Sequence, residues 1–383
     1  MKQGWEIKKL GEVCEVIGGS TPKTSDDTFW DGDYYWISPA ELDGSKYVYS
    51  TTRTITDAGV RSAHLQILPI GTVLLSSRAP IGKVAITKVP MYCNQGFKNL
   101  VCGKDLINEY VYWFLKHNTD YLNSLGTGAT FKEISKKVVA QIPIPVPPIA
   151  EQEKIVAELD CLSGIIEKKK QQLKELDNLA QSIFYEMFGD PVENDKGWEK
   201  KRLDEIGKVI TGNTPSTKDE SNYSSADYCF VKPSDIAKDS ISYISNTEFY
   251  VSEKAYINSR QLPKGSVLTT CIGIIGKVGI LQKDATCNQQ INAIIPNKDI
   301  DAKFLAHVLF MIRDVLTDVA NAPIVPIINK KEFSSVSIPV PLFSLQQDFA
   351  SQIESIEKQK ELISQSIKET ETLFNSRMDY YFN

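Results

Sequence analysis

Residues 142–187 read IPIPVPPIAEQEKIVAELDCLSGIIEKKKQQLKELDNLAQSIFYEM. The alternating prolines at the start impose an extended, stiff segment, because proline restricts its own backbone and donates no backbone hydrogen bond. After them, apolar residues recur at alternating steps of four and three, the heptad spacing of a coiled coil. The pattern predicts a helix of about 40 residues and about 60 Å, which Gly189 and Pro191 terminate. Its predicted seam comprises Ile155, Leu159, Leu162, Ile166, Leu173, Leu176, Ile183 and Met187.

The same spacing recurs at the end of the sequence. The seam of this second predicted helix comprises Phe349, Ile353, Ile356, Ile363, Ile367 and Phe374. Each helix is too long for one small module to cover. Two arrangements are open: each helix packs on its own globular part, or the two helices pair with each other. We favour an antiparallel coiled coil, which would relate the globular parts by an approximate two-fold axis.

The helices belong to a repeat that covers the whole sequence. Residues 4–6 and 19–22 recur as 197–199 and 212–215 at an offset of 193, and later motifs recur at an offset of 194. The later motifs are LPxGxVL at 68–74 and 262–268, IGKVxI at 81–86 and 275–280, CNQ at 93–95 and 287–289, and IPVP at 144–147 and 338–341. We therefore predict domains at 1–148 and 190–342, with long helices at 149–189 and 343–383.

The globular parts mix short strands with helices. In the first copy, residues 73–76, 84–86 and 96–101 are rich in β-branched and other apolar residues and are predicted strands. Residues 108–116 carry aromatic side chains at helical spacing and are predicted to be a helix. The fold class is therefore α+β, with two duplicated domains joined by two long helices.

Charge is divided unequally between these parts. The chain of 383 residues has a net charge of −5, which argues against a nucleic-acid binder. The helical segments 151–190 and 344–383, however, hold 16 acidic and 9 basic residues, so they carry −7 and the remainder carries +2. The globular parts can therefore still present a local basic face to phosphates.

Several catalytic and metal-binding classes lack their motifs in this sequence. Both Gly-Lys pairs are followed by valine, so no phosphate-binding P-loop is present. The seven cysteines are scattered and the three histidines fall at non-equivalent repeat positions, which argues against structural zinc and favours a reducing cytoplasm. No apolar stretch is long enough to span a membrane. We predict no catalytic residues and no metal ligands.

The motifs together resemble the specificity subunit of type I restriction-modification systems. The resemblance rests on the Gly-Trp-x-x-x-x-Leu start, the Gly-Ser-Thr-Pro loop, the LPxGxVL strand, the Ile-Pro-x-Pro-Pro-x-x-Glu-Gln helix entry and the heptads, most of them in duplicate. The second copy departs at its helix entry, where Pro341-Leu342 and Leu345-Gln346 stand in place of Pro-Pro and Glu-Gln.

The resemblance implies two target-recognition domains that each read one half of a split sequence in double-stranded DNA. The helices would act as a ruler between them and as the docking site for modification subunits, two in number, with restriction or translocase subunits joining through the complex. Methylation and cleavage would belong to those partners, which would bind S-adenosylmethionine, ATP and magnesium. This chain would bind no cofactor, act in the cytoplasm and be non-catalytic.

Candidate DNA-binding residues are polar and basic side chains expected on exposed loops, since phosphates bind Lys, Arg and hydroxyls and base edges bind Arg, Asn, Gln and Ser. In the first domain they are Ser20, Thr21, Lys23, Ser76, Ser77, Arg78 and Lys132; in the second they are Asn213, Thr214, Lys218, Thr270, Lys277 and Lys330. Arg78 aligns with Ile272, as expected if the two domains read different half-sites.

Two rival functions use the same architecture. The chain could be a coiled-coil scaffold whose paired domains bind protein or glycan, or a self-contained restriction endonuclease. Steep salt dependence of binding separates DNA recognition from the scaffold, because phosphate contacts release counterions. Cleavage of DNA by the chain alone would favour the endonuclease.

Overall fold

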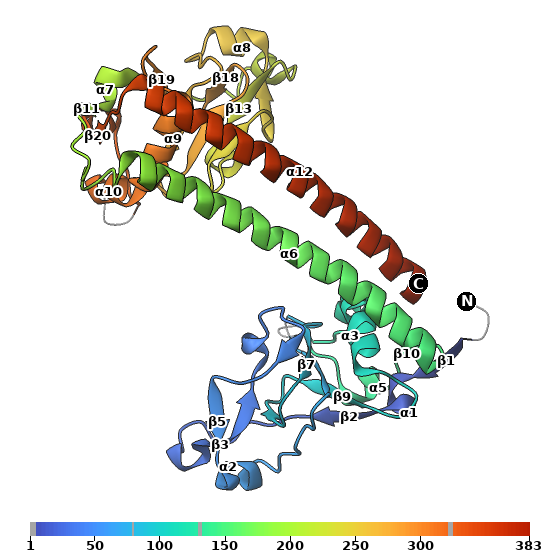
Figure 1. Cartoon of the computed structure of the whole chain (residues 1–383). Helices are drawn as coiled ribbons and strands as arrows, with labels where there is room; N and C mark the ends of the chain where they lie inside the picture. The colour runs from blue at the N-terminus through green and yellow to red at the C-terminus, as the bar shows by residue number, and fades with distance from the viewer. Residues whose placement is uncertain (1–4, 79, 129–131, 321–324) are drawn as a thin grey trace. The chain divides into compact units, whose positions relative to one another are not determined.

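The computed structural model describes residues 5–78, 80–128, 132–320 and 325–383. The chain divides into two compact units, of which unit 1 comprises Met1–Lys168 and Ser366–Asn383 and unit 2 comprises Lys169–Gln365. Each unit holds one globular head and a segment of each long helix, α6 (Ile149–Phe188) and α12 (Phe343–Phe382) (Figure 1). Both predicted helices are therefore present, and each has 40 residues.

Head 1, the globular part of unit 1 before α6, alternates short strands with short helices. Its elements are β1 (Glu6–Lys9), α1 (Leu10–Val13), β2 (Cys14–Gly18), η1 (Asp27–Phe29), β3 (Trp30–Ile37), η2 (Pro39–Glu41), β4 (Tyr47–Val48), β5 (Arg53–Ile55), α2 (Asp57–Ser62), β6 (Val73–Leu75), β7 (Val84–Thr87), β8 (Tyr92–Cys93), β9 (Lys98–Cys102), α3 (Asn108–His117), α4 (Thr119–Ser124), α5 (Lys136–Ala140) and β10 (Pro143–Val146).

Head 2, the globular part of unit 2 between α6 and α12, repeats this order. Its elements are β11 (Lys200–Arg202), α7 (Leu203–Ile206), β12 (Gly207–Thr211), η3 (Glu220–Tyr223), β13 (Tyr228–Val231), η4 (Pro233–Asp235), β14 (Ser242–Ile244), β15 (Phe249–Val251), α8 (Glu253–Ile257), β16 (Val267–Thr270), β17 (Val278–Leu281), β18 (Ala285–Cys287), β19 (Ile291–Pro296), α9 (Ala302–Met311), α10 (Arg313–Val319), α11 (Lys330–Ser335) and β20 (Ser337–Pro339).

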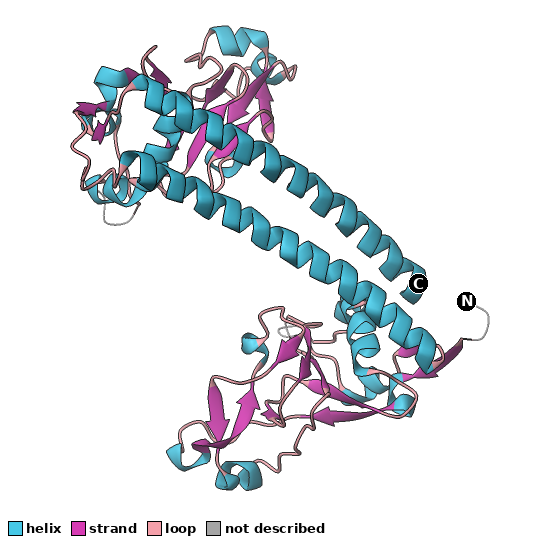
Figure 2. Cartoon of the chain, in the orientation of Figure 1, coloured by secondary structure: helices cyan, strands magenta, loops and turns pink. Residues whose placement is uncertain are grey.

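The sheets of the two heads have the same strand order. Across the described residues, the five-stranded sheet runs β2-β9-β6-β7-β4 in head 1 and β12-β19-β16-β17-β14 in head 2. The three-stranded sheets β5-β3-β8 and β15-β13-β18 correspond in the same way, as do the two-stranded sheets β1-β10 and β11-β20. The duplicated α+β fold is thus confirmed, and Figure 2 shows that the strands lie in the heads while the long helices carry none.

The two-stranded sheet closes each head. Strand β1 pairs antiparallel with β10, which places Glu6 opposite Val146 and Lys9 opposite Pro143. Strand β11 pairs with β20 in the same manner. The extended proline segment before each long helix is therefore a strand that returns beside the start of its head.

Aromatic side chains join each head to the long helices of its own unit. In unit 1, Trp113 of α3 packs edge-on against Phe374 of α12, with ring centroids 5.5 Å apart. In unit 2, Phe304 of α9 lies 5.0 Å from Phe188 of α6, which in turn lies 5.3 Å from Phe349 of α12. Each such ring pair contributes about 0.5–1.5 kcal/mol beyond the area it buries, so head and helices form one core in each unit.

Within each unit the helix segments run antiparallel, and the structure places every predicted seam residue in a buried or half-buried position. Ile155, Leu159, Ile166, Phe349, Ile353, Ile356 and Ile367 are buried, and Leu162, Leu173, Leu176, Ile183, Met187, Ile363 and Phe374 are half-buried. The prediction missed Phe184, Phe188, Met378 and Phe382, which are also buried. These residues lie beside the seam and face the head, which heptad spacing alone does not reveal.

Candidate nucleic-acid interface

A glycine begins the first repeated loop of each head because the chain passes very close to a neighbouring turn. A Cβ atom on Gly19 would lie 2.2 Å from the carbonyl oxygens of Cys93 and Asn94. Gly212 meets the oxygens of Cys287 and Asn288 at the same distance. The repeated Gly-x-Thr-Pro and Cys-Asn-Gln motifs therefore form one substructure.

Hydrogen bonds fix this substructure identically in both heads. The backbone amides of Ser20 and Asn213 donate to the oxygens of Cys93 and Cys287 at 3.0 and 2.9 Å. The Thr21 hydroxyl donates to Gln95 Oε1, and the Thr214 hydroxyl donates to Gln289 Oε1 at 2.7 Å. Gln95 and Gln289 are exposed at the tips of their turns. They were not among the predicted site residues, although their recurrence in both copies was a signal for them.

Three predicted contact residues are not exposed, which corrects the prediction. Ser76, Ser77 and Thr270 are fully buried. The Ser76 hydroxyl donates to Pro80 O and accepts from the Lys83 amide, both at 2.8 Å, and the Thr270 hydroxyl donates to Ile274 O at 2.6 Å. These hydroxyls hold the hairpin between two strands together because they satisfy backbone groups that would otherwise be buried unpaired.

Lys277 is only half-exposed, because its side chain makes a structural contact. Its ammonium group donates to Pro233 O at 2.9 Å. The equivalent Lys83 donates to Leu42 O at 2.8 Å. This lysine therefore fastens the 3₁₀ turn before β4 or β14 to the hairpin in both heads, and its charge is partly withdrawn from the surface.

The exposed Arg78 belongs to a charged network in head 1. Arg78 Nε donates to Glu133 Oε2 at 2.9 Å, and Lys98 Nζ lies 3.2 Å from Glu133 Oε1. Lys98 also reaches Ser77 Oγ at 3.2 Å and Gln95 O at 3.4 Å. Burial raises the pKa of Glu133, but the hydrogen bonds from Arg78 and Lys98 outweigh it and lower the pKa below 4.5.

These contacts link five residues that we name the tip cluster: Thr21, Arg78, Gln95, Lys98 and Glu133. The equivalent positions in head 2 are Thr214, Ile272, Gln289, Asn292 and Ile327. The backbone bridge between Arg78 and Glu133 recurs between Ile272 and Ile327. The frame is therefore the same in both heads, while the three charged side chains of head 1 (Arg78, Lys98 and Glu133) are replaced in head 2 by two isoleucines and an asparagine.

The remaining predicted lysines are exposed. Lys23 follows the glycine loop of head 1 and Lys218 follows that of head 2, while Lys132 precedes Glu133 of the tip cluster. Lys330 is the first residue of α11, so its equivalent in head 1 is Lys136 at the start of α5 and not Lys132. Lys132 and Lys330 therefore do not occupy equivalent positions in the two heads.

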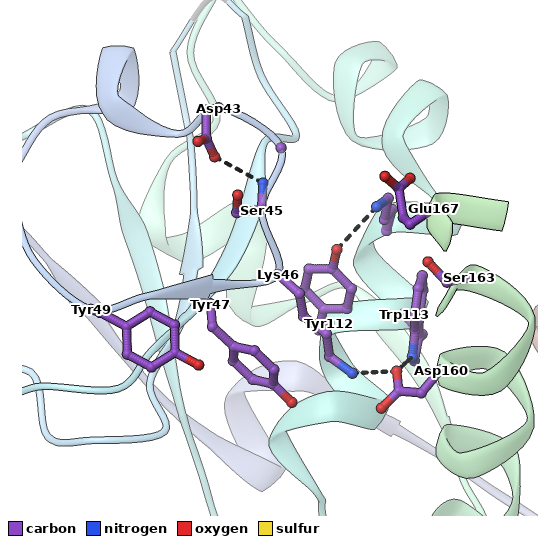
Figure 3. A pocket seen from close by; sticks show the side chains of 12 residues that line it. Asp43, Ser45, Lys46, Tyr47, Tyr49, Tyr112, Trp113, Asp160, Ser163 and Glu167 are labelled. Atoms are coloured by element: carbon purple, nitrogen blue, oxygen red, sulfur yellow. Dashed lines mark hydrogen bonds and ion pairs between the residues drawn. The ribbon is translucent and has the colours of Figure 1, made fainter. Parts of the chain in front are cut away.

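A cleft of about 840 Å³ lies between head 1 and its segment of α6. Figure 3 shows Lys46 and Trp113 both directed at Asp160 of α6, with Tyr47 and Tyr49 on the opposite wall. Trp113 Nε1 donates to Asp160 Oδ1 at 2.8 Å, and Lys46 forms an ion pair with the same oxygen. Lys46 Nζ also lies 5.2 Å from the centre of the Trp113 ring, within the range of a cation–π interaction. The polar end of the cleft is thus filled by the hydrogen bond and the ion pair that join the head to α6.

The equivalent place in unit 2 is nearly closed. Its cavity measures about 30 Å³ and is lined in part by His307, Phe310 and Lys360, which replace Trp113, Lys116 and Ile166. Burial lowers the pKa of His307 to about 4, and its Nδ1 donates to Lys303 O at 2.8 Å. Among the residues the structure describes, no group of three His, Cys, Asp or Glu side chains could hold a metal ion. Within the same ranges, no helix is long and apolar enough to cross a membrane.

Comparison with known proteins identifies the family. The model for the type I restriction modification DNA specificity domain matches residues 2–178 and 195–372. The MjaIX specificity subunit of Methanocaldococcus jannaschii is 37% identical over 253 residues, which is 61% of this chain and 58% of that protein. The chain thus spans less than two thirds of the length of this relative.

Solved structures share the fold over the whole chain. The type I restriction-modification S subunit from M. genitalium superposes with a TM-score of 0.61 at 14% identity, covering 100% of this chain and 98% of that one. A chain from a study of complex assembly and conformational transition of the type I R-M system gives a TM-score of 0.62 at 19% identity, with the same coverage. The matched family model occurs twice, as the duplicated heads and strand orders require, and the chain belongs to the family of type I restriction-modification DNA specificity domains.

Proposed function

We propose that this chain is the DNA-recognition subunit of a type I restriction-modification complex, with each head reading one half of a bipartite duplex target. The observation that carries the proposal is the tip cluster. Its threonine and glutamine are the same in both heads, whereas Arg78, Lys98 and Glu133 are replaced by Ile272, Asn292 and Ile327. At the accessible positions the frame is constant but carries Arg78 and Glu133 in head 1 and Ile272 and Ile327 in head 2. This difference suits two readers of different sequences, because base edges are distinguished by the groups presented to them.

Exchange of one head tests this proposal directly. Residues 1–148 are replaced by the corresponding head of a relative, and the modified bases are mapped across the genome of a host that carries the complete system. We expect one half of the recognised sequence to change and the other half to remain. If both halves change together, the heads do not read independently and the proposal fails.

We further propose that the chemistry belongs to other polypeptides, with S-adenosylmethionine bound by the modification subunits and ATP and magnesium bound by the restriction subunits. Support comes from the absence of a P-loop from the sequence. Purified chain incubated with target duplex, Mg²⁺, ATP and S-adenosylmethionine should leave the DNA uncut and unmethylated. Cleavage by the chain alone would identify the rival endonuclease.

The length of the long helices supports the proposal that they act as a ruler between the half-sites. A helix of 40 residues is about 60 Å long, which is less than two turns of B-DNA at about 34 Å per turn. We therefore propose that the length of the helices sets the distance between the two half-sites on one duplex.

Two exposed leucines at equivalent positions on the helices support the proposal that two modification subunits dock there. Leu179 of α6 is 47% exposed and Leu373 of α12, its counterpart, is 50% exposed. Large apolar side chains left uncovered at duplicated positions suit a partner that is present twice. Each leucine would contact one modification subunit.

Single substitutions test the docking surface. Leu179→Glu and Leu373→Glu should each remove one modification subunit from the complex, and the double variant should remove both, as measured by native mass spectrometry. Asn178→Glu and Asn375→Glu, at exposed positions close to these leucines, are matched controls that should leave assembly intact. Full assembly of the double variant would place the modification subunits elsewhere.

A further inference from the structure

Each unit contains an ion pair that joins α6 to α12. In unit 1, Arg377 reaches Glu158 through two nitrogens, at 2.5 and 2.9 Å, and the Tyr381 hydroxyl donates to the same carboxylate at 2.5 Å. In unit 2, Lys360 Nζ lies 2.7 Å from Asp177 Oδ1 and 2.9 Å from Glu357 Oε1. In both pairs the acid lies on α6 and the base on α12.

The basic partners lie in the seam and are substantially covered. The side chain of Lys360 is 16% exposed and that of Arg377 is 30% exposed. Burial by itself lowers the pKa of Lys360, but hydrogen bonds to Asp177 and Glu357 raise it above 10.5. Both bases therefore remain charged. Arg377 is compensated by Glu158 on α6, and Lys360 is compensated by Asp177 on α6 together with Glu357 on its own helix.

The duplication shows that α6 lacks these bases. The counterparts of Lys360 and Arg377 on α6 are Ile166 and Ile183, and Ile166 is buried in the seam of unit 1. The counterparts of Glu158 and Asp177 on α12 are Gln352 and Glu371. Two helices that arose as copies have thus acquired different seam charges.

The different seam charges affect how well each helix could pair with a copy of itself in the same antiparallel register. If α6 paired with the α6 of a second chain, Glu158 would face Ile183 and Asp177 would face Ile166. Both acids would lose their bases at partly covered positions, and this arrangement would occur twice across the two-fold axis. If α12 paired with α12, Arg377 would face Gln352, but Lys360 would still meet Glu371. Pairing of α6 with itself is therefore the more strongly disfavoured.

We propose that the Glu158–Arg377 and Asp177–Lys360 pairs select α12 as the partner of α6 and exclude association of α6 with the α6 of a second copy of this chain. The apolar seam supplies most of the affinity but does not distinguish the copies, because both helices carry Ile, Leu and Phe at heptad positions. Charged residues at seam positions specify the partner at some cost in stability.

Charge exchange in the full chain tests this selection. An acidic variant carries Lys360→Glu and Arg377→Glu, a basic variant carries Glu158→Arg and Asp177→Lys, and a fourth chain carries all four substitutions. We expect the thermal midpoint to fall by about 3–8 °C in each double variant and to recover by at least half in the fourfold variant. Lys358→Glu with Glu361→Lys, on exposed positions of α12, is the matched control and should change the midpoint little.

Mixing the variants measures partner choice itself. The acidic and basic variants, distinguished by mass, are unfolded and refolded together and analysed by native mass spectrometry. We expect a heterodimer enriched at least tenfold over either homodimer, because only that species places acids opposite bases along both helix pairs. The test holds even if each double variant fails to fold alone. Two results would overturn the proposal. One is a statistical mixture of homodimers and heterodimers, and the other is a fourfold variant whose loss of thermal midpoint equals the sum of the losses in the two double variants.

Discussion

Arg78 donates from Nε to Glu133 Oε2 at 2.9 Å, and the two residues also face each other across a backbone bridge. The same bridge joins Ile272 to Ile327 in head 2. The backbone is therefore held in both heads, while one side-chain pair is charged and the other is apolar. Duplication within one chain separates the residues that maintain the frame from those that are free to set sequence preference.

Substitution at this position should alter one half-site. Arg78→Ile gives head 1 the side chain that head 2 carries, so we expect the frame to survive and recognition of the first half-site to change. A bidentate arginine contact discriminates between bases by about 1–3 kcal/mol, which corresponds to roughly 5- to 150-fold in selection from randomised duplexes. Ile272→Arg is the reciprocal control and should affect the second half-site alone. Changes in both half-sites from either substitution would contradict the assignment.

The exposed lysines should contribute affinity without sequence preference. Lys23→Ala and Lys132→Ala in head 1, and Lys218→Ala and Lys330→Ala in head 2, should weaken binding to all duplexes alike. For each lysine that contacts a phosphate, the slope of log affinity against log salt should fall by about 0.9. Fluorescence anisotropy between about 50 and 200 mM salt measures this slope. Affinity that is insensitive to salt would favour the scaffold function over DNA recognition.

Helix length should set the spacing between half-sites. Insertion of one heptad into each of α6 and α12 keeps the seam in phase and adds about 10 Å, or about three base pairs at roughly 3.4 Å each. We expect the spacer to lengthen by that amount while the half-sites keep their sequence, as read by methylome mapping. An unchanged spacer would show that the helices do not measure the distance.

The glycine of the first repeated loop should be intolerant of a side chain. Gly19→Ala places a Cβ atom 2.2 Å from two backbone oxygens, which cannot move away as the end of a flexible side chain could. We expect a loss of about 1–3 kcal/mol in the free energy of unfolding, measured by urea denaturation. Gly18→Ala is the matched control, because a Cβ atom added at Gly18 would meet no atom within 4 Å beyond the adjoining residues. Equal stability of the two variants would show that the loop can shift.

Unit 2 should lose stability in mild acid through His307. Burial holds the pKa of His307 at about 4, with Lys360 lowering it further and Asp177 opposing that effect. A histidine in the unfolded chain has a pKa of about 6.5. Between about pH 4 and 6.5 the unfolded chain therefore binds a proton at His307 that the folded chain does not bind. The stabilisation is complete above pH 6.5 and is lost as the pH falls towards 4, by about 3 kcal/mol at most. Urea unfolding across this range should show the slope, and His307→Gln should flatten it; an identical slope in both proteins would assign it to other groups.

The sequence predicted those features of the fold that appear in it as periodic spacing of apolar residues or as repeated motifs. The heptad spacing predicted α6 and α12, because it is a local pattern. The repeat offset of 193 to 194 residues predicted two equivalent heads, because the same motifs return in the same order. Strands β4 and β8 have two residues each and gain their stability from parallel partners far along the chain, so no local pattern predicts them. Long-range packing likewise determines which residues beside the seam, such as Phe184, face a head.

The candidate site was predicted less well because exposure depends on tertiary contacts. Ser76 directly follows β6 and Thr270 is the last residue of β16, but the hairpin folds back so that their hydroxyls bind its own backbone. Gln95 and Gln289 recur in the two copies and could have been identified by that recurrence alone. Which of the exposed side chains differ between the heads was visible in the sequence, and Arg78 opposite Ile272 was the clearest case.

The pairing of β1 with β10 has an evolutionary consequence. Because Glu6 lies opposite Val146, the first and last strands of head 1 are neighbours, about 5 Å apart at paired positions. A gene segment encoding the head can therefore be exchanged at two sites that meet in space, with the incoming segment grafted onto an unaltered stem. Strands β11 and β20 offer the same junction in the second copy. Under the proposed function, such shuffling would supply new target sequences without any change to the long helices.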